Sequence, residues 1–272
     1  MSLVTATRSE VTKQFSTAGW WVLAIVLVLY VAVTAGLLAL VFGGVASGRL
    51  PGARGAALST EGLSAMVYST ASTVGYVFPL LAGTLMVTTE FRHKTLTPTF
   101  LAVPRRGRVL AAKVVVAVVV GALYGVLGTV AAIGAGAPVL SAFGVATDLG
   151  ASDTWVLAGR MVLAFVVWAL IGVGVGSVVR NQVAAIVIVL AVTLFVEPIV
   201  RTVAGLVDGL SDAARWFPSA ASDALVGHSV FGSMSTAASA PLEWWVGGLV
   251  LLAYAAVLLV VGMLTTWRRD VD

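Results

Sequence analysis

Six long apolar runs dominate the chain, and they limit what it can fold into more than any other feature. Each is long enough to cross the hydrocarbon core of a bilayer, which takes about 20 residues of helix. The runs cover residues 20–42, 66–89, 109–137, 155–179, 183–203 and 244–266. Hydrophobic residues make up 60% of the chain and charged residues only 10%, against about 25% in soluble domains. The sequence therefore predicts an all-α integral membrane protein with a single membrane domain over residues 1–272. Because the run 20–42 is too long for the apolar core of a signal peptide, we expect it to be retained as the first span.

The basic residues are distributed unevenly around these runs, and the asymmetry predicts how the chain crosses the membrane. Short loops rich in Lys and Arg stay on the cytoplasmic side of a bilayer. An even number of spans puts both chain ends on one side, and eleven of the 16 basic residues then face the same compartment. These are Arg8, Lys13, Arg92, Lys94, Arg105, Arg106, Arg108, Lys113, Arg180, Arg268 and Arg269. We therefore expect both termini in the cytoplasm. Since the basic residues flank apolar runs and form no patch with aromatic residues, we expect no binding of nucleic acid.

Residues 1–18 precede the first span and have the pattern of an amphipathic helix. On a helical wheel one face holds Val4, Thr7, Val11, Phe15 and Ala18, and the other holds Ser9, Thr12, Lys13 and Ser16. This pattern predicts a helix that lies in the inner membrane interface. Trp20 and Trp21 would mark the headgroup level where the chain turns into the first span. A disordered basic N-terminus is the alternative.

The last loop on the outer side, residues 204–243, is longer than the other loops. It contains the apolar stretches 203–210 and 224–231, which are too short to cross a membrane. Such stretches predict short re-entrant helices that dip into the outer leaflet and return.

The chain lacks the residue patterns of common catalytic and cofactor sites. It contains no cysteine and only two histidines, so we expect neither thiolate chemistry nor a multi-histidine metal site. None of its lysines follows a glycine, which excludes a phosphate-binding loop for ATP. We expect no catalytic residue, metal or cofactor in this chain. The glycines inside the apolar runs, among them Gly121, Gly125, Gly172, Gly174 and Gly176, indicate close approach of helices.

Three ionisable residues lie inside apolar runs, where such residues often have a function. They are Arg160, Glu197 and Arg201. The spacing of Glu197 and Arg201 predicts an ion pair on one helix face, and Pro198 between them should bend or break the helix. Two interpretations stay open: a structural pair where the helix ends, or a polar element of an outward gate.

The second apolar run carries more polar residues than the other runs do. Ser72, Tyr76, Pro79 and Gly83 fall on one helix face. This face would form a mildly polar, kinked wall of a translocation path. The alternative is ordinary packing, because Ser and Thr side chains commonly bond to carbonyl groups of their own helix.

Residues 90–108 form a polar island between the second and third apolar runs. Its basic residues, with Lys113 just beyond, stand against a single acid, Glu90. Within the island Thr97 and Pro98 have the pattern of a helix start, and Pro104 ends any helix before it. The sequence thus predicts a short helix over about 98–102 that exposes Phe100 and Leu101. Exposed apolar side chains are unfavourable in water unless another surface buries them. A soluble partner is one such surface, and the inner leaflet of the membrane is the alternative.

The island resembles the cytoplasmic coupling region of permease subunits of ABC transporters of the type 2 exporter class. The residues that match the family pattern are Glu90, Phe91, Arg92, Thr95, Leu96, Thr99, Pro104, Arg106 and Lys113. Phe100 departs from the pattern, because the family usually has an aliphatic residue there. Weaker likenesses occur at residues 216–221 and 268–271. An interfacial N-terminal helix and six spans are also features of that family.

The resemblance implies a permease that pairs with a second, identical copy and binds two copies of a cytosolic ABC ATP-binding subunit. ATP and Mg would be bound in that partner. The residues implied to couple to the ATPase are Glu90, Phe91, Arg92, Thr95, Leu96, Thr99, Phe100, Leu101, Pro104 and Arg106. The path or gate would include Ser72, Tyr76, Pro79, Glu197 and Arg201.

The cargo implied by the resemblance is a drug, antibiotic, lipid or other amphiphile. It would be exported across a bacterial cell (inner) membrane, as in multidrug efflux. One alternative is a self-sufficient secondary transporter or channel, a class that usually shows inverted repeats or charged broken helices. The other is a membrane scaffold that transports nothing.

Overall fold

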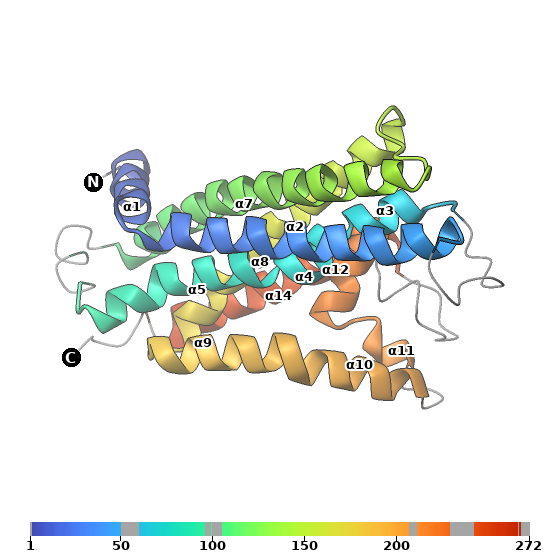
Figure 1. Cartoon of the computed structure of the whole chain (residues 1–272). Coiled ribbons are helices and arrows are strands. Elements are labelled where there is room, and N and C mark those ends of the chain that lie inside the picture. Colours follow the sequence, from blue (N-terminus) through green and yellow to red (C-terminus); the bar gives the residue numbers. More distant parts are fainter. Residues whose placement is uncertain are drawn as a thin grey trace.

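The computed structural model describes residues 2–49, 60–95, 99, 105–206, 211–228, 242–265 and 267. Nearly all of these residues are helical, and none of them lies in a β-strand. Six helical segments are long and apolar enough to cross a membrane. The prediction of an all-α, multi-pass membrane protein is therefore confirmed. The long helices lie side by side in an elongated bundle (Figure 1).

The helices match the predicted spans closely. The first, third, fourth and sixth spans are single helices: α2 (Gly19–Ala46), α7 (Arg106–Ala142), α8 (Ser152–Val178) and α14 (Trp244–Thr265). The second span consists of α3 (Leu63–Tyr68), α4 (Thr70–Gly75) and α5 (Val77–Arg92). The fifth span consists of α9 (Gln182–Ala191), the π-helical turn η1 (Val192–Val196) and α10 (Glu197–Leu206). Helix α1 (Leu3–Ser16) precedes the first span, and α11 (Ser211–Ala214) and α12 (Pro218–Val226) follow the fifth.

Two of the irregular points in the spans lie one turn before a proline. A proline ring clashes with the carbonyl group four residues earlier and offers it no backbone donor. For Pro79 that residue is Gly75, where α4 ends. For Pro198 it is Leu194, which lies in the wider π-helical turn η1. The predicted break at Pro198 is wrong, because α9, η1 and α10 follow one another without a gap, and the irregularity takes the form of a π-helical turn before the proline.

The second and fourth spans lie at the centre of the bundle and are the most buried of the six. Helices α5 and α8 approach so closely that a Cβ atom on Gly83 or Gly172 would overlap the backbone of the other helix. On α7, a Cβ atom on Gly121 or Gly125 would lie 2.7 or 2.8 Å from a Cα atom of α8. These glycines therefore have the packing role that the sequence indicated.

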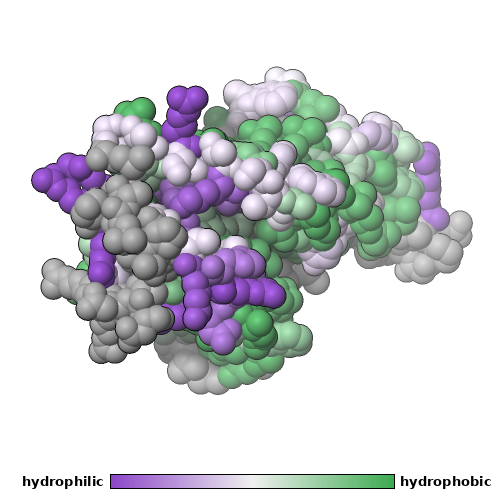
Figure 2. Space-filling model, turned by 90° about the vertical axis from the view of Figure 1, so that its left-hand side faces the viewer, coloured by the Kyte–Doolittle hydropathy of each residue, from purple (hydrophilic) through white to green (hydrophobic). Residues whose placement is uncertain are grey.

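The outer helices expose apolar side chains along their length. On α2 and α9, exposed residues include Val22, Ile25, Leu29, Val33, Val183 and Val187. Hydrophobic residues cover the sides of the molecule, whereas hydrophilic ones gather at the end that faces the viewer in Figure 2. That end carries α1 and the end of α14 in Figure 1, and we refer to it as the α1 end. The opposite end is the far end.

Helix α1 lies crosswise at the end of the bundle (Figure 1). Its first turn is capped by Ser2, whose side chain accepts a hydrogen bond from the backbone N–H of Thr5. The chain then turns into α2 at Trp20, whose indole N–H donates to the carbonyl oxygen of Phe15 at 3.1 Å. The prediction of a helix within residues 1–18 is thus confirmed over Leu3–Ser16, and the alternative of a disordered N-terminus is wrong. Its contact with a membrane stays a prediction.

The described part of the last loop contains two short helices, but their positions differ from the stretches 203–210 and 224–231 that the sequence indicated. Residues 203–206 are the end of α10, and the short helices are α11 and α12, of which α12 overlaps the second stretch only at 224–226. Helix α12 folds back against α8 and α14 and buries Ala221, Leu225 and Val226. Residues 229–241 lie outside the described part of the chain. How deeply α12 enters a leaflet stays a prediction.

Candidate functional site

Four charged side chains from three helices meet at the α1 end, and we call them the ionic cluster. They are Glu10 and Lys13 of α1, Glu90 of α5 and Lys113 of α7. The ammonium group of Lys113 lies 2.6 Å from Glu10 Oε2 and 3.1 Å from Glu90 Oε2. The ammonium group of Lys13 lies 2.7 Å from Glu10 Oε1 and 2.9 Å from Glu90 Oε1. Each carboxylate therefore bridges both lysines.

The ionic cluster lies largely out of contact with solvent. Lys113 is 0% exposed, Glu10 is 4% exposed and Glu90 is 7% exposed. Lys113 also donates a hydrogen bond to the carbonyl oxygen of Met86 at 3.2 Å. A buried charge is costly unless it is paired and hydrogen-bonded. With two acids and two lysines the cluster has no net charge, and its members neutralise one another.

The pKa values of the two α1 residues reflect this pairing. Burial alone would raise the pKa of Glu10, but Lys113 and Lys13 outweigh it and hold that pKa below its ordinary value of 4.5. Burial alone would lower the pKa of Lys13, but Glu10 and Glu90 raise it above its ordinary value of 10.5. Both residues are therefore charged at neutral pH.

The polar island leaves the bundle directly beside the ionic cluster. Lys13 contacts Thr99 Oγ1 at 3.4 Å, and Thr99 donates to the carbonyl oxygen of Thr95 at 2.8 Å. At the other end of the island, Arg106 donates to the carbonyl oxygen of Trp267 at 2.7 Å. The island is thus attached to α1 and to the chain that follows α14.

The predicted coupling residues fall into two groups. Phe91 is half-buried against the core, Thr95 is exposed, and exposed Arg92 contacts the Gln182 side chain at 3.5 Å. Leu96, Phe100, Leu101 and Pro104 lie outside the described residues, as does nearly all of the helix predicted over 98–102. Their role stays a prediction.

Two residues at the α1 end were missed by reasoning from the sequence. Glu10 was assigned no role, although Lys113 stands just inside an apolar run and needs a counter-charge there. The chain contains only 12 acidic residues, so the need of Lys113 for a counter-charge was a signal that could have pointed to Glu10. Trp267 is only 2% exposed, and its burial depends on how the chain folds back after α14. No local pattern indicates that contact.

A second polar cluster lies at the far end, between α10 and α12. Arg201 pairs with Asp223 at 2.9 Å and donates to the hydroxyl group of Ser219 at 2.9 Å. The carboxylate of Glu197 accepts the backbone N–H of Ser219 in the first turn of α12. The predicted ion pair between Glu197 and Arg201 is therefore wrong. Each side chain reaches across to α12, because that helix offers Glu197 free N–H groups and offers Arg201 an acid.

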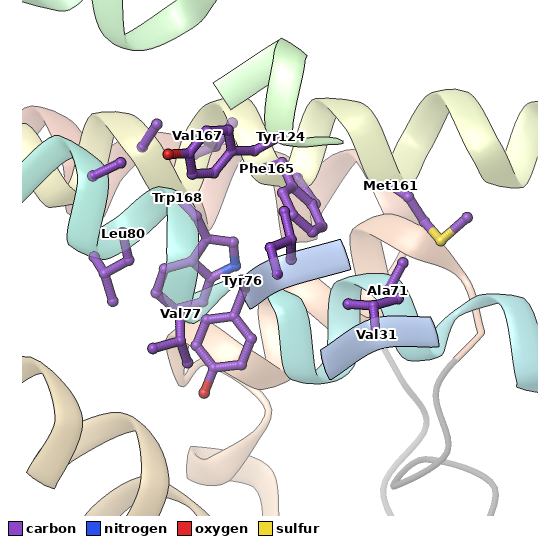
Figure 3. Packing of buried hydrophobic residues seen from close by; sticks show 14 of the residues in the cluster. Val31, Ala71, Tyr76, Val77, Leu80, Tyr124, Met161, Phe165, Val167 and Trp168 are labelled. Atoms are coloured by element: carbon purple, nitrogen blue, oxygen red, sulfur yellow. The ribbon is translucent and has the colours of Figure 1, made fainter. Parts of the chain in front are cut away.

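The residues of the second span that were expected to line a path are buried within the single chain. Ser72 donates to the carbonyl oxygen of Ser69 on its own span at 2.9 Å, as the packing alternative expects. Tyr76 donates to the carbonyl oxygen of Thr193 in η1 at 3.2 Å. Its ring lies beside that of Trp168, with centroids 4.4 Å apart (Figure 3). Pro79 is also buried. A path lined by these residues stays a prediction.

The two clusters differ in the helices they join and in their burial. The ionic cluster joins α1 to α5 and α7, and three of its four side chains are buried. The far cluster joins α10 to α12 through side chains that are partly exposed.

No family model matches the chain, and no curated protein matches it either.

Proposed function

We propose that the chain is the membrane-spanning subunit of an ATP-driven exporter. The observation that carries this proposal is the ionic cluster, which joins crosswise α1 to the helix ends on both sides of the polar island. An exporter of this kind needs a rigid connection between the segment that contacts its ATPase and the helices that move. A shared set of buried charges supplies one, since separating its members exposes unpaired charge.

In this proposal the residues 90–108 face the cytoplasm and form the contact with two ATP-binding subunits. The exposed cations Arg92, Lys94 and Arg105 suit a surface on a soluble partner. ATP and Mg are bound in the partner, and closure of its two copies moves the island and α1 together. A second copy of the chain completes the translocation path.

The cargo is a drug, antibiotic, lipid or other amphiphile that leaves a bacterial cell across its inner membrane. A largely apolar path suits an amphiphile better than a small ion, because a desolvated ion requires charged or carbonyl ligands. Both chain ends lie in the cytoplasm, as the distribution of basic residues favours.

The direct test is purification of the tagged full-length chain from its native membrane. We expect a co-purifying ATP-binding subunit and ATP hydrolysis by the complex. The chain produced alone should bind no nucleotide. Micromolar ATP binding by the single chain would contradict the proposal, and so would a native complex without an ATPase.

A double substitution locates the contact with the ATPase. Changing Phe100 and Leu101 together to Asp should remove the partner while membrane insertion is retained. Loss of two buried apolar side chains costs roughly 3–6 kcal/mol of binding free energy. The matched control is Leu149→Asp, which places a charge at an exposed apolar position at the far end. Equal recovery of the ATPase with both variants would contradict the assigned contact.

A further inference from the structure

Arg160 lies on α8 near the far end, in an environment unlike that of the other cations. Its guanidinium carbon is 4.8 Å from the centroid of the Trp244 ring, a cation–π contact. On another side it faces Gly227, where an added Cβ atom would lie 3.1 Å from Arg160 Nη1. The guanidinium is therefore held between an indole ring and a loop backbone. It is partly exposed at the outer surface of the bundle.

The N–H groups of Arg160 donate to no acceptor in the part of the chain that the structure describes. The other described cations of the far end each have a partner. Arg49 donates to the carbonyl oxygen of Ala142, Arg201 pairs with Asp223, and Arg215 lies 3.8 Å from Asp212. Glu243 directly precedes Trp244, yet it forms no ion pair with Arg160. A guanidinium has five N–H donors, and the described part of the chain supplies an acceptor for none of them, so these donors can bind an acceptor from outside the chain.

The depth of the site in a bilayer follows from the length of α14. This helix has 22 residues, and at 1.5 Å per residue it is about 33 Å long, close to the hydrocarbon thickness. Trp244 is its first residue, so the indole ring lies near the headgroup level. Trp155 and Trp245 are also exposed, as expected of an aromatic belt. The guanidinium in contact with Trp244 therefore lies at the depth of lipid headgroups.

We propose that Arg160 and Trp244 form a binding site for the phosphate group of a phospholipid in the leaflet at the far end. A phosphate offers the oxygen acceptors that the guanidinium lacks, in a geometry that its planar fork matches. The exposed apolar side chain of Leu163 lies about one turn deeper along the same helix. It provides a surface for the acyl chains below the headgroup. This site does not depend on the transport function proposed above.

The experiment is native mass spectrometry of the full-length protein in detergent. Wild type and a variant are mixed in one sample, so that both meet the same lipid concentration. The probes are dioleoyl-phosphatidylglycerol, the matched dioleoylglycerol without a phosphate, and inorganic phosphate. The variants are Arg160→Gln and Arg160→Lys. Arg49→Gln serves as the control, because Arg49 also lies beside an aromatic ring at the far end but has an acceptor within the chain.

We expect phosphatidylglycerol to bind Arg160→Gln roughly tenfold more weakly than wild type, as loss of a charge-assisted hydrogen bond implies. Arg160→Lys should lie between the two, and Arg49→Gln should bind like wild type. Dioleoylglycerol should not distinguish the variants. The proposal is overturned if Arg160→Gln binds phosphatidylglycerol as wild type does, or if wild type prefers phosphatidylglycerol no more than dioleoylglycerol. Binding of inorganic phosphate as tight as that of the lipid would overturn a lipid as the source of the phosphate.

Discussion

Lys113 is the residue on which the ionic cluster depends most. Its ammonium group contacts both carboxylates, and its side chain is only 1% exposed. Lys13 contacts the same two acids, but 40% of its side chain is exposed. Water can replace Lys13 as a partner more readily than it can replace Lys113. The two lysines therefore form a natural pair for comparison.

Lys113→Met should lower the free energy of unfolding by about 3–5 kcal/mol, because it leaves two buried carboxylates with one partly exposed lysine. Lys13→Met should cost no more than about 1 kcal/mol, as for exposed ion pairs. The measurement is unfolding of the purified protein in mixed micelles, followed by circular dichroism. Equal losses for the two variants would show that burial of Lys113 is unimportant.

Stability should also depend on pH through the same residues. The pKa of Glu10 is lowered in the folded protein, so its contribution is present above about 4.5 and is lost as pH falls through the folded value. The pKa of Lys13 is raised, so its contribution is present below about 10.5 and is lost as pH rises through the folded value. Between these limits we expect the melting temperature to be nearly constant.

Glu10→Gln provides the test of this pH dependence. It removes the titrating group, so the acid part of the melting-temperature profile should become shallower while the alkaline part keeps its direction. An acid part as steep as that of wild type would assign the acid sensitivity to other carboxylates.

Among the secondary-structure elements, the spans were predictable and their connections to one another were not. Long apolar runs and prolines are local signals, and they indicated the six spans and the irregularity at Pro198. The partner of Arg201 is 22 residues away on another helix. A spacing of four suggested Glu197 as the partner, but the fold brings α12 closer. Contacts between elements depend on packing that no local pattern contains.

The connection between α10 and α12 can be measured by a double-mutant cycle. Arg201→Gln and Asp223→Asn, alone and together, should give a coupling energy of about 0.5–3 kcal/mol in unfolding. The corresponding cycle for Glu197→Gln and Arg201→Gln should give a smaller value, because these side chains bind different groups of α12. A larger coupling for Glu197 and Arg201 would restore the ion pair that the sequence suggested.

For the whole molecule, the six spans bring α1, the end of α5, the start of α7 and the end of α14 to the same end of the bundle (Figure 1). Because the chain contains no cysteine, single cysteines can report which compartment each end faces. Ser9 and His93 are exposed at the α1 end, and Ser152 is exposed at the far end. These three positions form a matched set.

In intact cells, a maleimide that cannot cross the membrane should label Ser152→Cys and leave Ser9→Cys and His93→Cys unlabelled. All three should react after the membrane is opened. The expectation follows from the excess of basic residues on the α1 side, which favours the cytoplasm. Labelling of Ser9→Cys and His93→Cys in intact cells would reverse the orientation.

The ionic cluster also has a consequence for the order in which the protein is made. Glu10, Lys13 and Glu90 are synthesised before Lys113. Without Lys113, these three side chains together carry one net negative charge. We therefore expect helix α1 to acquire its final position only once the third span has entered the membrane. Nascent chains arrested before residue 113 should leave α1 open to a protease. Chains arrested after the third span should protect it.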